Sequence, residues 1–351
     1  MTAPVCLMSL ATAVPPHVVQ QTEALDYARE MFAGRFEDFE RMAAVFANTG
    51  IRTRRLSRPL EWYLEPRGWS ERTAVYLETA DALFVEAACA ALAAAGLTAA
   101  DVDTVITVSS TGIATPSIEA RVFGEMGFRQ DVARVPVFGL GCAGGVTGLS
   151  LAARLAAVRP GSVVLVVTIE LCTLAFRLDE LTKANIVATA LFGDGAAACV
   201  VRADPDGEYR IEGYGEHTWP DTLDIMGWNV DPQGFGVIFA RAIPPFVRRE
   251  IGGAVDSMLR GMGLDRADVG RFVCHPGGSK VIDALERALA LEQGRLDHER
   301  EVLAEFGNMS APTVLFVLER VLKAGAPDRM FLSSLGPGFT ASGLSLLKAA
   351  A

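Results

Sequence analysis

Short runs of almost uninterrupted apolar residues alternate along the chain with longer, helix-like segments. Runs such as Val163–Val167 predict strands that are buried on both faces, because a half-exposed strand would alternate apolar and polar residues. The segment Val5–Leu10 predicts a first strand, and Val146–Val158 and Thr313–Lys323 predict apolar helices. This alternation is typical of an α/β fold in which helices cover the sheets.

One pattern occurs twice in the chain. Residues 96–110 and 263–276 each read as a glycine that ends a helix, a turn capped by Asp and a buried strand. Residues 138–158 and 306–323 form a second pair, and the strands 162–168 and 330–335 form a third, weaker pair. The three pairs follow in order at offsets of 167 to 168 residues, which indicates a duplicated unit.

Two such halves, related by a pseudo-twofold axis, predict a layered αβαβα architecture. The turn-rich segment Asp204–Gly207 is the expected boundary, with an N-terminal half over residues 1–204 and a C-terminal half over residues 205–351. No low-complexity linker separates the halves, so we expect one compact body.

Composition narrows the class of protein. With 32 Lys and Arg against 42 Asp and Glu, the net charge is −10, which disfavours nucleic-acid binding. Mean hydropathy is +0.29, but the longest uncharged stretch near the middle of the chain, residues 137–153, is short and rich in glycine, so no membrane span is expected. The first 22 residues lack the basic start of a secretory signal, and we expect a cytoplasmic protein. The six cysteines include no CxxC pair, so neither a zinc site nor a disulfide framework is expected.

Cys142 is the first candidate for chemistry. It lies between glycines directly before a predicted helix, where the helix dipole and free backbone N–H groups stabilise a thiolate. The position therefore predicts a lowered pKa for this thiol and a place for an oxyanion, although a small residue packed at a crowded turn would show the same pattern.

Two further candidates lie in the second half. His275 follows a short strand and precedes a Gly-rich loop, which is where α/β sites are usually found. Asn308 lies before a helix, a position that suits an ordinary N-cap. The repeat, however, makes Ser310 the counterpart of Cys142, so the pseudo-twofold would bring Cys142, His275 and Asn308 to one pocket.

These residues resemble a known family. The Cys before a buried helix, His275-Pro-Gly-Gly, Gly307-Asn-Met-Ser and Gly336-Pro-Gly-Phe-Thr are similar to motifs of the type III polyketide synthases, the chalcone-synthase-like branch of the thiolase fold. The resemblance covers nearly the whole chain and implies an acyltransferase, a homodimer and a Cys142–His275–Asn308 triad. It also implies acyl-CoA and malonyl-CoA as substrates, with no metal or other cofactor.

The resemblance implies a mechanism as well. Cys142, as a thiolate paired with imidazolium His275, would attack a starter acyl-CoA. Loss of CO₂ from malonyl-CoA would leave an enolate held by His275 and Asn308, and a Claisen condensation would follow. Repeated extension and cyclisation would complete the reaction.

The same resemblance extends to the substrate cavity and to the CoA site. Gatekeeper and cavity positions match Phe192, Val237, Trp228, Ala175, Cys172, Ser110, Thr111, Thr115 and Ser310. Ser110, Thr111 and Thr115 match cavity and dimer-crossing positions. The basic cluster Arg52, Arg54 and Arg55 matches the region of the CoA phosphates, and Lys280 is a weaker candidate. Core packing and a solvated surface are the respective alternatives.

Short segments point to a subgroup. Residues 224–231 and 111–117 resemble bacterial alkylpyrone and alkylresorcinol synthases, which implies a long fatty acyl starter. Three alternatives stay open: a tetrahydroxynaphthalene-type synthase that uses malonyl-CoA alone, an enzyme like ketoacyl synthase III that performs one condensation, and a catalytically silent dimeric partner.

Overall fold

The apolar runs predicted as strands form one extended sheet in the computed structural model, which describes residues 4–204 and 207–349. The strands are β1 (Val5–Ala13), β2 (His17–Gln20), β3 (Thr53–Leu56), β4 (Thr104–Val108), β5 (Ala133–Val137), β6 (Val163–Leu171), β7 (Asp194–Ala203), β8 (Tyr209–Thr218), β9 (Met226–Asp231), β10 (Gly234–Phe239), β11 (Arg271–Cys274), β12 (Arg329–Gly336) and β13 (Thr340–Lys348). The large sheet has nine strands in the order β11-β12-β13-β8-β1-β7-β6-β4-β5.

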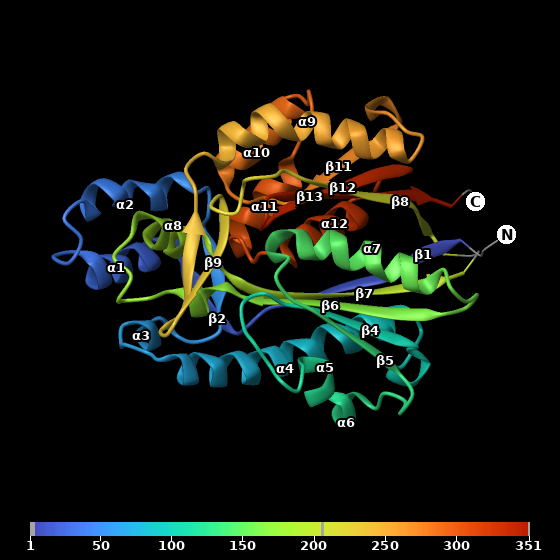
Figure 1. Ribbon diagram of the computed structural model, residues 1–351, viewed down its shortest axis with the longest axis horizontal. Coiled ribbons are helices and arrows are strands. Elements are labelled where there is room, and N and C mark those ends of the chain that lie inside the picture. Colours follow the sequence, from blue (N-terminus) through green and yellow to red (C-terminus); the bar gives the residue numbers. More distant parts are fainter. Residues whose placement is uncertain (1–3, 205–206, 350–351) are drawn as a thin grey trace.

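Helices cover and separate the two arms of this sheet. The α-helices are α1 (Gln21–Phe32), α2 (Phe39–Asn48), α3 (Leu60–Tyr63), α4 (Trp69–Ala94), α5 (Ile118–Arg121), α6 (Phe123–Met126), α7 (Gly144–Ala156), α8 (Lys183–Leu191), α9 (Ile243–Gly261), α10 (Ser279–Ala288), α11 (Asp297–Phe306) and α12 (Thr313–Lys323). Short 3-10 turns are η1 (Ala99–Asp101), η2 (Gly141–Ala143), η3 (Cys172–Ala175) and η4 (Arg266–Asp268). Figure 1 shows α7 and α12 between the arms, α4 outside one arm, and α9 and α10 outside the other, which is the predicted layering.

The predicted duplication is visible in the sheet topology. In the first half β4 pairs in parallel with β6, and β6 pairs antiparallel with β7. In the second half β11 pairs in parallel with β12, and β12 pairs antiparallel with β13. The arms join through a short β1–β8 pairing, and β5 is an added edge strand of the first arm. The two halves are therefore copies of one unit joined into a single sheet.

Most predicted elements are confirmed with small changes at their ends. Strand β6 is buried at all nine positions, as its continuous apolar run requires. Helix α12 has the predicted bounds, α7 begins and ends two residues earlier than predicted, and β1 continues three residues farther, to Ala13. The expected boundary between the halves includes residues 205–206, which lie outside the described residues. No helix in the described part of the chain is long and apolar enough to cross a membrane.

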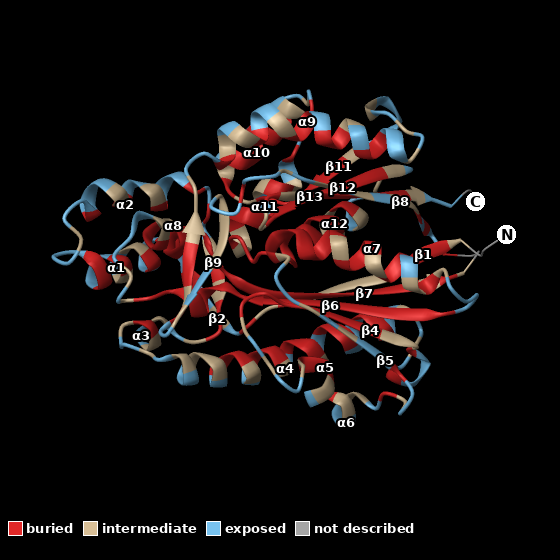
Figure 2. Cartoon of the chain, viewed as in Figure 1, coloured by how far each residue is buried: buried red, intermediate tan, exposed pale blue. Residues whose placement is uncertain are grey.

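Close packing of α7 against α12 places the first loop of the candidate site. Figure 2 shows the two central helices mostly buried, while the outer helices expose one face. A Cβ on Gly145 would lie 2.3 Å from the Ala311 carbonyl oxygen, so only glycine allows this approach of the two helices. Gly141 has a φ of +47°, and a Cβ there would lie 2.6 Å from Pro337. Glycines therefore fix the turn that carries Cys142.

Candidate active site

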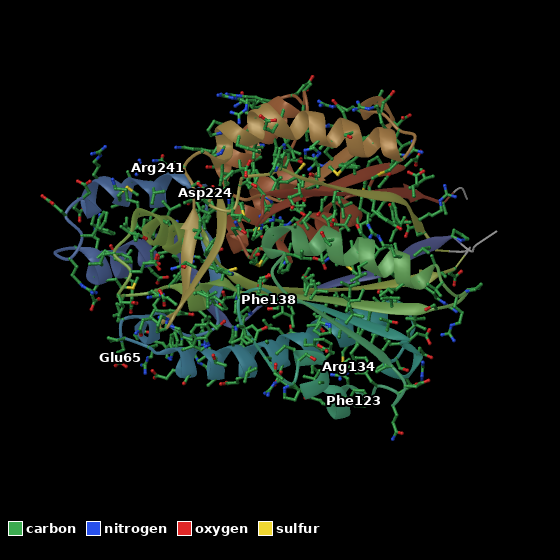
Figure 3. The ribbon with its side chains drawn as sticks, viewed as in Figure 1. Glu65, Phe123, Arg134, Phe138, Asp224 and Arg241 are labelled. Atoms are coloured by element: carbon green, nitrogen blue, oxygen red, sulfur yellow. The ribbon has the colours of Figure 1, made fainter. Side chains whose placement is uncertain are left out.

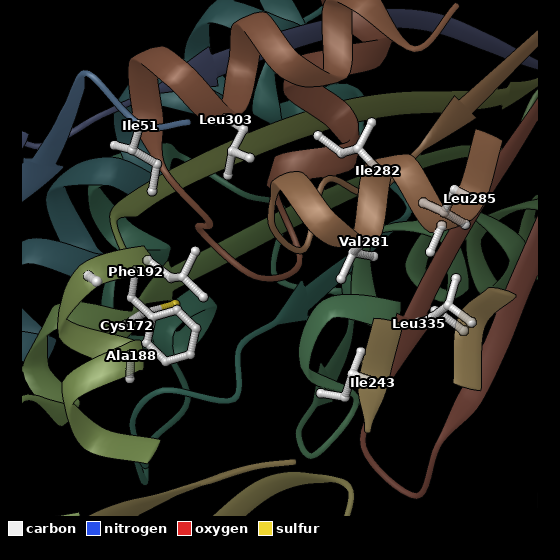
Figure 4. Close-up of a cluster of buried hydrophobic side chains, with 14 of the residues drawn as sticks. Ile51, Cys172, Ala188, Phe192, Ile243, Val281, Ile282, Leu285, Leu303 and Leu335 are labelled. Carbon is white, nitrogen blue, oxygen red and sulfur yellow. The ribbon is translucent and has the colours of Figure 1, made fainter. Parts of the chain in front are cut away.

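Cys142, His275 and Asn308 line one cavity, although they come from three separate loops. Cys142 lies in η2 before α7, His275 follows β11, and Asn308 follows α11. Aliphatic side chains from α9, α10 and β12, among them Ile243, Val281, Leu285 and Leu335, form much of the remaining wall and appear together in Figure 4. The convergence expected from the repeat is present in the structure.

Ser110 holds the turn that carries the cysteine. Its hydroxyl oxygen accepts hydrogen bonds from the backbone N–H groups of Gly139 at 3.2 Å and Gly141 at 3.0 Å. The Ser110 carbonyl in turn accepts a hydrogen bond from the Trp228 indole at 2.8 Å. Ser110 was predicted to line the cavity. Its observed contacts instead place it behind the Cys142 loop, where it fixes the position of the sulfur.

The backbone fixes Asn308 from both sides. Its N–H donates to the Leu191 carbonyl at 2.8 Å, and its own carbonyl accepts from Gly193 N–H at 3.0 Å. This bridge lies opposite Phe192, the predicted gatekeeper. The Asn308 side-chain oxygen accepts from the backbone N–H of Ser310 at 2.8 Å, and its amide nitrogen lies 3.4 Å from the Gly277 carbonyl. The amide is thus held by the loop that follows His275.

His275 is buried with both ring nitrogens free. Its backbone N–H donates to the Ser333 carbonyl at 2.8 Å, which continues the β11–β12 pairing into the loop. Neither Nδ1 nor Nε2 has a hydrogen-bond partner among the described residues. An imidazole with two unpartnered nitrogens in a cavity is available to exchange a proton with a bound molecule or to donate a hydrogen bond to it.

The predicted lowering of the Cys142 pKa is wrong for this chain. Burial raises the pKa of the thiol to about 12, even though hydrogen bonding by Ser310 and Asn308 acts in the opposite direction. Burial also lowers the pKa of His275 to about 3. The loss of water around the charged forms therefore outweighs the helix N-terminus, and burial favours a neutral Cys142 thiol and a neutral His275 imidazole in the same cavity.

A second cavity continues from Cys142 on the side of the β9–β10 hairpin. It is lined in part by the predicted residues Cys172, Phe192, Trp228, Val237 and Ser310. The Phe192 and Trp228 rings meet edge to face, with centroids 6.2 Å apart. Five of the nine predicted gatekeeper and cavity positions thus share a chamber with the sulfur.

The other predicted cavity residues lie elsewhere. Thr111 is buried, and its hydroxyl accepts from Leu171 N–H at 2.8 Å. Thr115 is exposed in this single chain. Ala175 is buried at the end of η3 and is not part of the wall of either cavity that contains Cys142. Its role in the cavity stays a prediction.

Glu170 is a residue of the site that the sequence analysis missed. This carboxylate is fully buried at the end of β6 and accepts from Ser110 N–H at 2.9 Å. Burial raises its pKa to about 7, against hydrogen bonds from Ser110, Thr111 and Ser310. Its charge also raises the pKa of Cys142. The only signal in the sequence was one acidic residue inside an otherwise apolar strand.

The three arginines of the basic cluster differ in how far they are buried. Arg54 is 1 % exposed, and its guanidinium donates to the carbonyls of Thr189 at 2.6 Å and Phe192 at 2.9 Å. The prediction that Arg54 binds CoA is therefore wrong, because strand β3 turns it inward to hold the Phe192 turn. Arg52 is exposed, and Arg55, on the opposite face of β3 from Arg54, is half-buried.

Two exposed cations flank the cavity that holds the triad. Lys280 lies next to Val281 on α10, and Arg241 precedes Ile243 on α9. Figure 3 shows Arg241 and Asp224 near each other at one end of the β9–β10 hairpin. Arg241 was not predicted. The side of the molecule that carries Lys280 also carries Arg52, because Ser279 Oγ donates to the Asn48 carbonyl at 2.9 Å.

Comparison with known proteins identifies the family. The models of the chalcone and stilbene synthases match residues 2–205 with their N-terminal domain and residues 215–348 with their C-terminal domain. The chain is 39% identical over 338 residues to the 1,3,6,8-tetrahydroxynaphthalene synthase of Streptomyces peucetius subsp. caesius, covering 94% of this chain and 89% of that protein. It is 29% identical to the alpha-pyrone synthesis polyketide synthase-like Pks18 of Mycobacterium tuberculosis, covering 95% and 89%.

A solved structure agrees with this assignment. The crystal structure of the tetrahydroxynaphthalene synthase from Streptomyces coelicolor A3(2), a bacterial type III polyketide synthase, superposes with a TM-score of 0.93 at 30% identity and covers 99% of this chain and 100% of that one. With the family models spanning almost the whole sequence and Cys142, His275 and Asn308 gathered in one cavity, the chain belongs to the chalcone and stilbene synthase family and is a type III polyketide synthase, an acyltransferase of the thiolase-like fold.

Proposed function

We propose that this enzyme extends a long-chain acyl starter, held on Cys142, with malonyl-CoA and closes the product to an alkylpyrone or alkylresorcinol. The observation that carries this proposal is the apolar lining beside the sulfur. Both cavities that share Cys142 are walled mainly by aliphatic and aromatic side chains, including Leu285, Leu335 and Phe239. An acyl chain is stabilised by such a wall in proportion to the apolar area that it buries.

Loading of the starter follows from the neutral resting pair. As the thioester enters, the Cys142 proton moves to a free nitrogen of His275, and the sulfur attacks the thioester carbonyl carbon. The carbon–sulfur bond to CoA breaks, and the CoA thiolate takes the proton back from His275. The products are acyl-Cys142, free CoA and a neutral imidazole ready for the next step.

Neutral His275 suits the second step. When malonyl-CoA loses CO₂, the electron pair of the broken carbon–carbon bond passes to the thioester and forms an enolate. In this proposal a ring N–H of His275 and the Asn308 amide N–H, which line the same cavity, donate hydrogen bonds to its oxygen. The enolate carbon then attacks the acyl-Cys142 carbonyl, and the cysteine sulfur leaves with the bond electrons. No cofactor takes part in these steps.

CoA recognition is proposed for cations at the surface, of which Arg52 and Lys280 are exposed and Arg55 is half-buried. Arg52, Arg55 and Lys280 keep this role after Arg54 is removed from the set. Arg52 forms a loose ion pair with Glu305 at 3.7 Å, both side chains being exposed, which a phosphate could replace at small cost. Exposed Arg241 extends the basic rim on the α9 side.

We also propose a homodimer. The outer edge of β5 has no neighbouring strand among the described residues, and Phe138, which follows it, is 55% exposed. Ile113 is 50% exposed in the loop after the adjacent strand β4. Figure 3 shows Phe138 on the arm of the sheet that contains β4 and β5. Light scattering would give twice the monomer mass, whereas a monomer would contradict this assembly.

A malonyl-only tetrahydroxynaphthalene-type reaction is the second candidate, favoured by the 39% identity to the Streptomyces peucetius enzyme. Purified protein is incubated with malonyl-CoA and no starter, a short acyl-CoA, a long acyl-CoA or an aromatic CoA, and the products are identified by mass spectrometry. Pyrones or resorcinols from the long starter support the proposal. Product from malonyl-CoA alone selects the second candidate.

A further inference from the structure

A buried carboxylate on α11 joins the strand that carries His275 to the helix that leads to Asn308. Glu299 has no exposed surface, and one of its oxygens accepts from the backbone N–H of Cys274, the residue before His275, at 2.9 Å. Helix α11 ends at Phe306, two residues before Asn308. We propose that Glu299 is a positioning residue that fixes His275 relative to Asn308.

The position of β11 in the sheet explains why a side chain is needed there. β11 is an edge strand, so only its inner side has a neighbouring strand, β12. On that inner side the loop continues the pairing through His275 N–H and the Ser333 carbonyl. On the outer side the Cys274 N–H would be buried without a partner if Glu299 did not accept its hydrogen bond. The end of the strand is therefore held from both sides immediately before the imidazole.

An arginine at the start of the same strand holds the carboxylate. Arg271 Nη2 lies 2.6 Å from the second Glu299 oxygen, and the Arg271 side chain is 9% exposed. Asp297 also faces this guanidinium, at 3.1 Å. Glu299 thus contacts the first and the last residue of β11 with its two oxygens, which fixes the strand along its length as well as at its end.

A second buried carboxylate provides a matched control. Glu286, on α10, accepts from Gly294 N–H and Leu296 N–H at 3.0 Å each and pairs with Arg300 at 2.6 Å. It joins backbone to arginine as Glu299 does, but its contacts are with the loop before α11 and with Arg300 on α11, and not with the strand that carries His275. Loss of Glu286 therefore reports loosening of α10 against α11 while the hydrogen bond from Cys274 N–H to Glu299 stays in place.

The test measures the step that uses His275 and Asn308, and it rests on the proposed function. Malonyl-CoA decarboxylation is assayed in a Cys142→Ala background with E299L, E299Q or E286L added. E299L is expected to lower kcat by about tenfold while KM changes by less than about twofold, because misplacing a catalytic group affects the transition state more than binding. E299Q, whose amide oxygen still accepts from Cys274 N–H, stays within about threefold of the parent.

Two outcomes overturn the positioning role: E299L within about twofold of its parent, or E286L with an equal loss of kcat in protein that is equally folded. If E299L does not fold, E299D replaces it, since its shorter side chain withdraws the carboxylate from Cys274 and predicts the same loss.

A second readout separates this proposal from the proposed function. The chain has four histidines, so His275 can be assigned in labelled protein by the signal lost in His275→Ala. The His275 ring signals are expected to move in E299L and to stay in place in E286L. Absence of decarboxylation in the parent would refute the proposed function, and unmoved His275 signals in E299L would refute the positioning role independently.

Discussion

The charge state of Cys142 before substrate binds is the feature in which this structure departs most from the local sequence. With burial raising the pKa of the thiol to about 12, nearly all molecules carry a protonated Cys142 at pH 7. A thiol at its reference pKa of about 8.5 would be ionised in about 3% of molecules at the same pH. A thiolate–imidazolium pair would be ionised in nearly all of them, so the three states are well separated.

The ultraviolet absorbance of the thiolate distinguishes these states. Spectra of the protein and of Cys142→Ala are recorded from about pH 5 to about pH 9, and their difference isolates Cys142. The structure predicts no thiolate absorbance from this residue across that range, because neither the sulfur nor His275 is charged. His275→Ala is expected to leave the difference spectrum unchanged.

The opposite result would refute the reasoning. A Cys142-dependent absorbance at neutral pH that disappears in acid and in His275→Ala would show a resident ion pair. The cost of burying the two charges would then be smaller than their mutual attraction in this cavity. The proton transfer that we place at substrate entry would already be complete in the free enzyme.

Four further outcomes are expected. Cys142→Ala should abolish condensation yet retain malonyl-CoA decarboxylation, seen as acetyl-CoA by mass spectrometry; loss of both steps would contradict the division of roles. Arg54→Met should lower the free energy of unfolding in urea by about 3 kcal/mol, because it removes two charge-assisted hydrogen bonds to the buried carbonyls of Thr189 and Phe192, and it should leave the KM for malonyl-CoA unchanged. Arg52→Gln should raise that KM and leave stability unaffected. Ala175 lines neither cavity that contains Cys142, so Ala175→Phe should shorten the starters accepted only if the acyl tunnel continues from these cavities to η3, and an unaltered chain-length profile would show that it does not. Hydrogen bonding by Arg300 lowers the pKa of Glu286 to about 2, below its value in the unfolded chain. The ionised Glu286 therefore stabilises the fold above about pH 4.3, and this stabilisation is lost as the pH falls toward 2. In E286Q the free energy of unfolding, measured in urea at each pH, should fall less steeply between these pH values.

The sequence predicted the fold well because its signals are local and repeated. The apolar run of β6 and the bounds of α12 follow from periodicity alone. The duplicated pattern also predicts that Cys142 and Asn308 lie at one centre, because it relates the two helix starts by the pseudo-twofold axis. The arrangement of the backbone and the chemically distinctive residues of a site can therefore be predicted directly from the sequence.

The burial of individual side chains could not be predicted from the sequence. Arg54 and Arg55 are adjacent arginines, but successive side chains of strand β3 point to opposite faces, so Arg54 is buried in the core and Arg55 is not. Glu170 lies inside an apolar strand, and nothing in the local sequence indicates that its charge acts on the Cys142 thiol. The same cause underlies the wrong pKa for Cys142, because a helix N-terminus is visible in the sequence and the surrounding desolvation is not.

The most direct test of the central claim is the capture of the starter on the enzyme. Intact protein is incubated with a long acyl-CoA, digested and analysed by mass spectrometry before and after malonyl-CoA is added. The account predicts one acyl group on Cys142 that disappears with malonyl-CoA as a polyketide product forms. An acyl group on another residue, or one on Cys142 that malonyl-CoA does not remove, would contradict it.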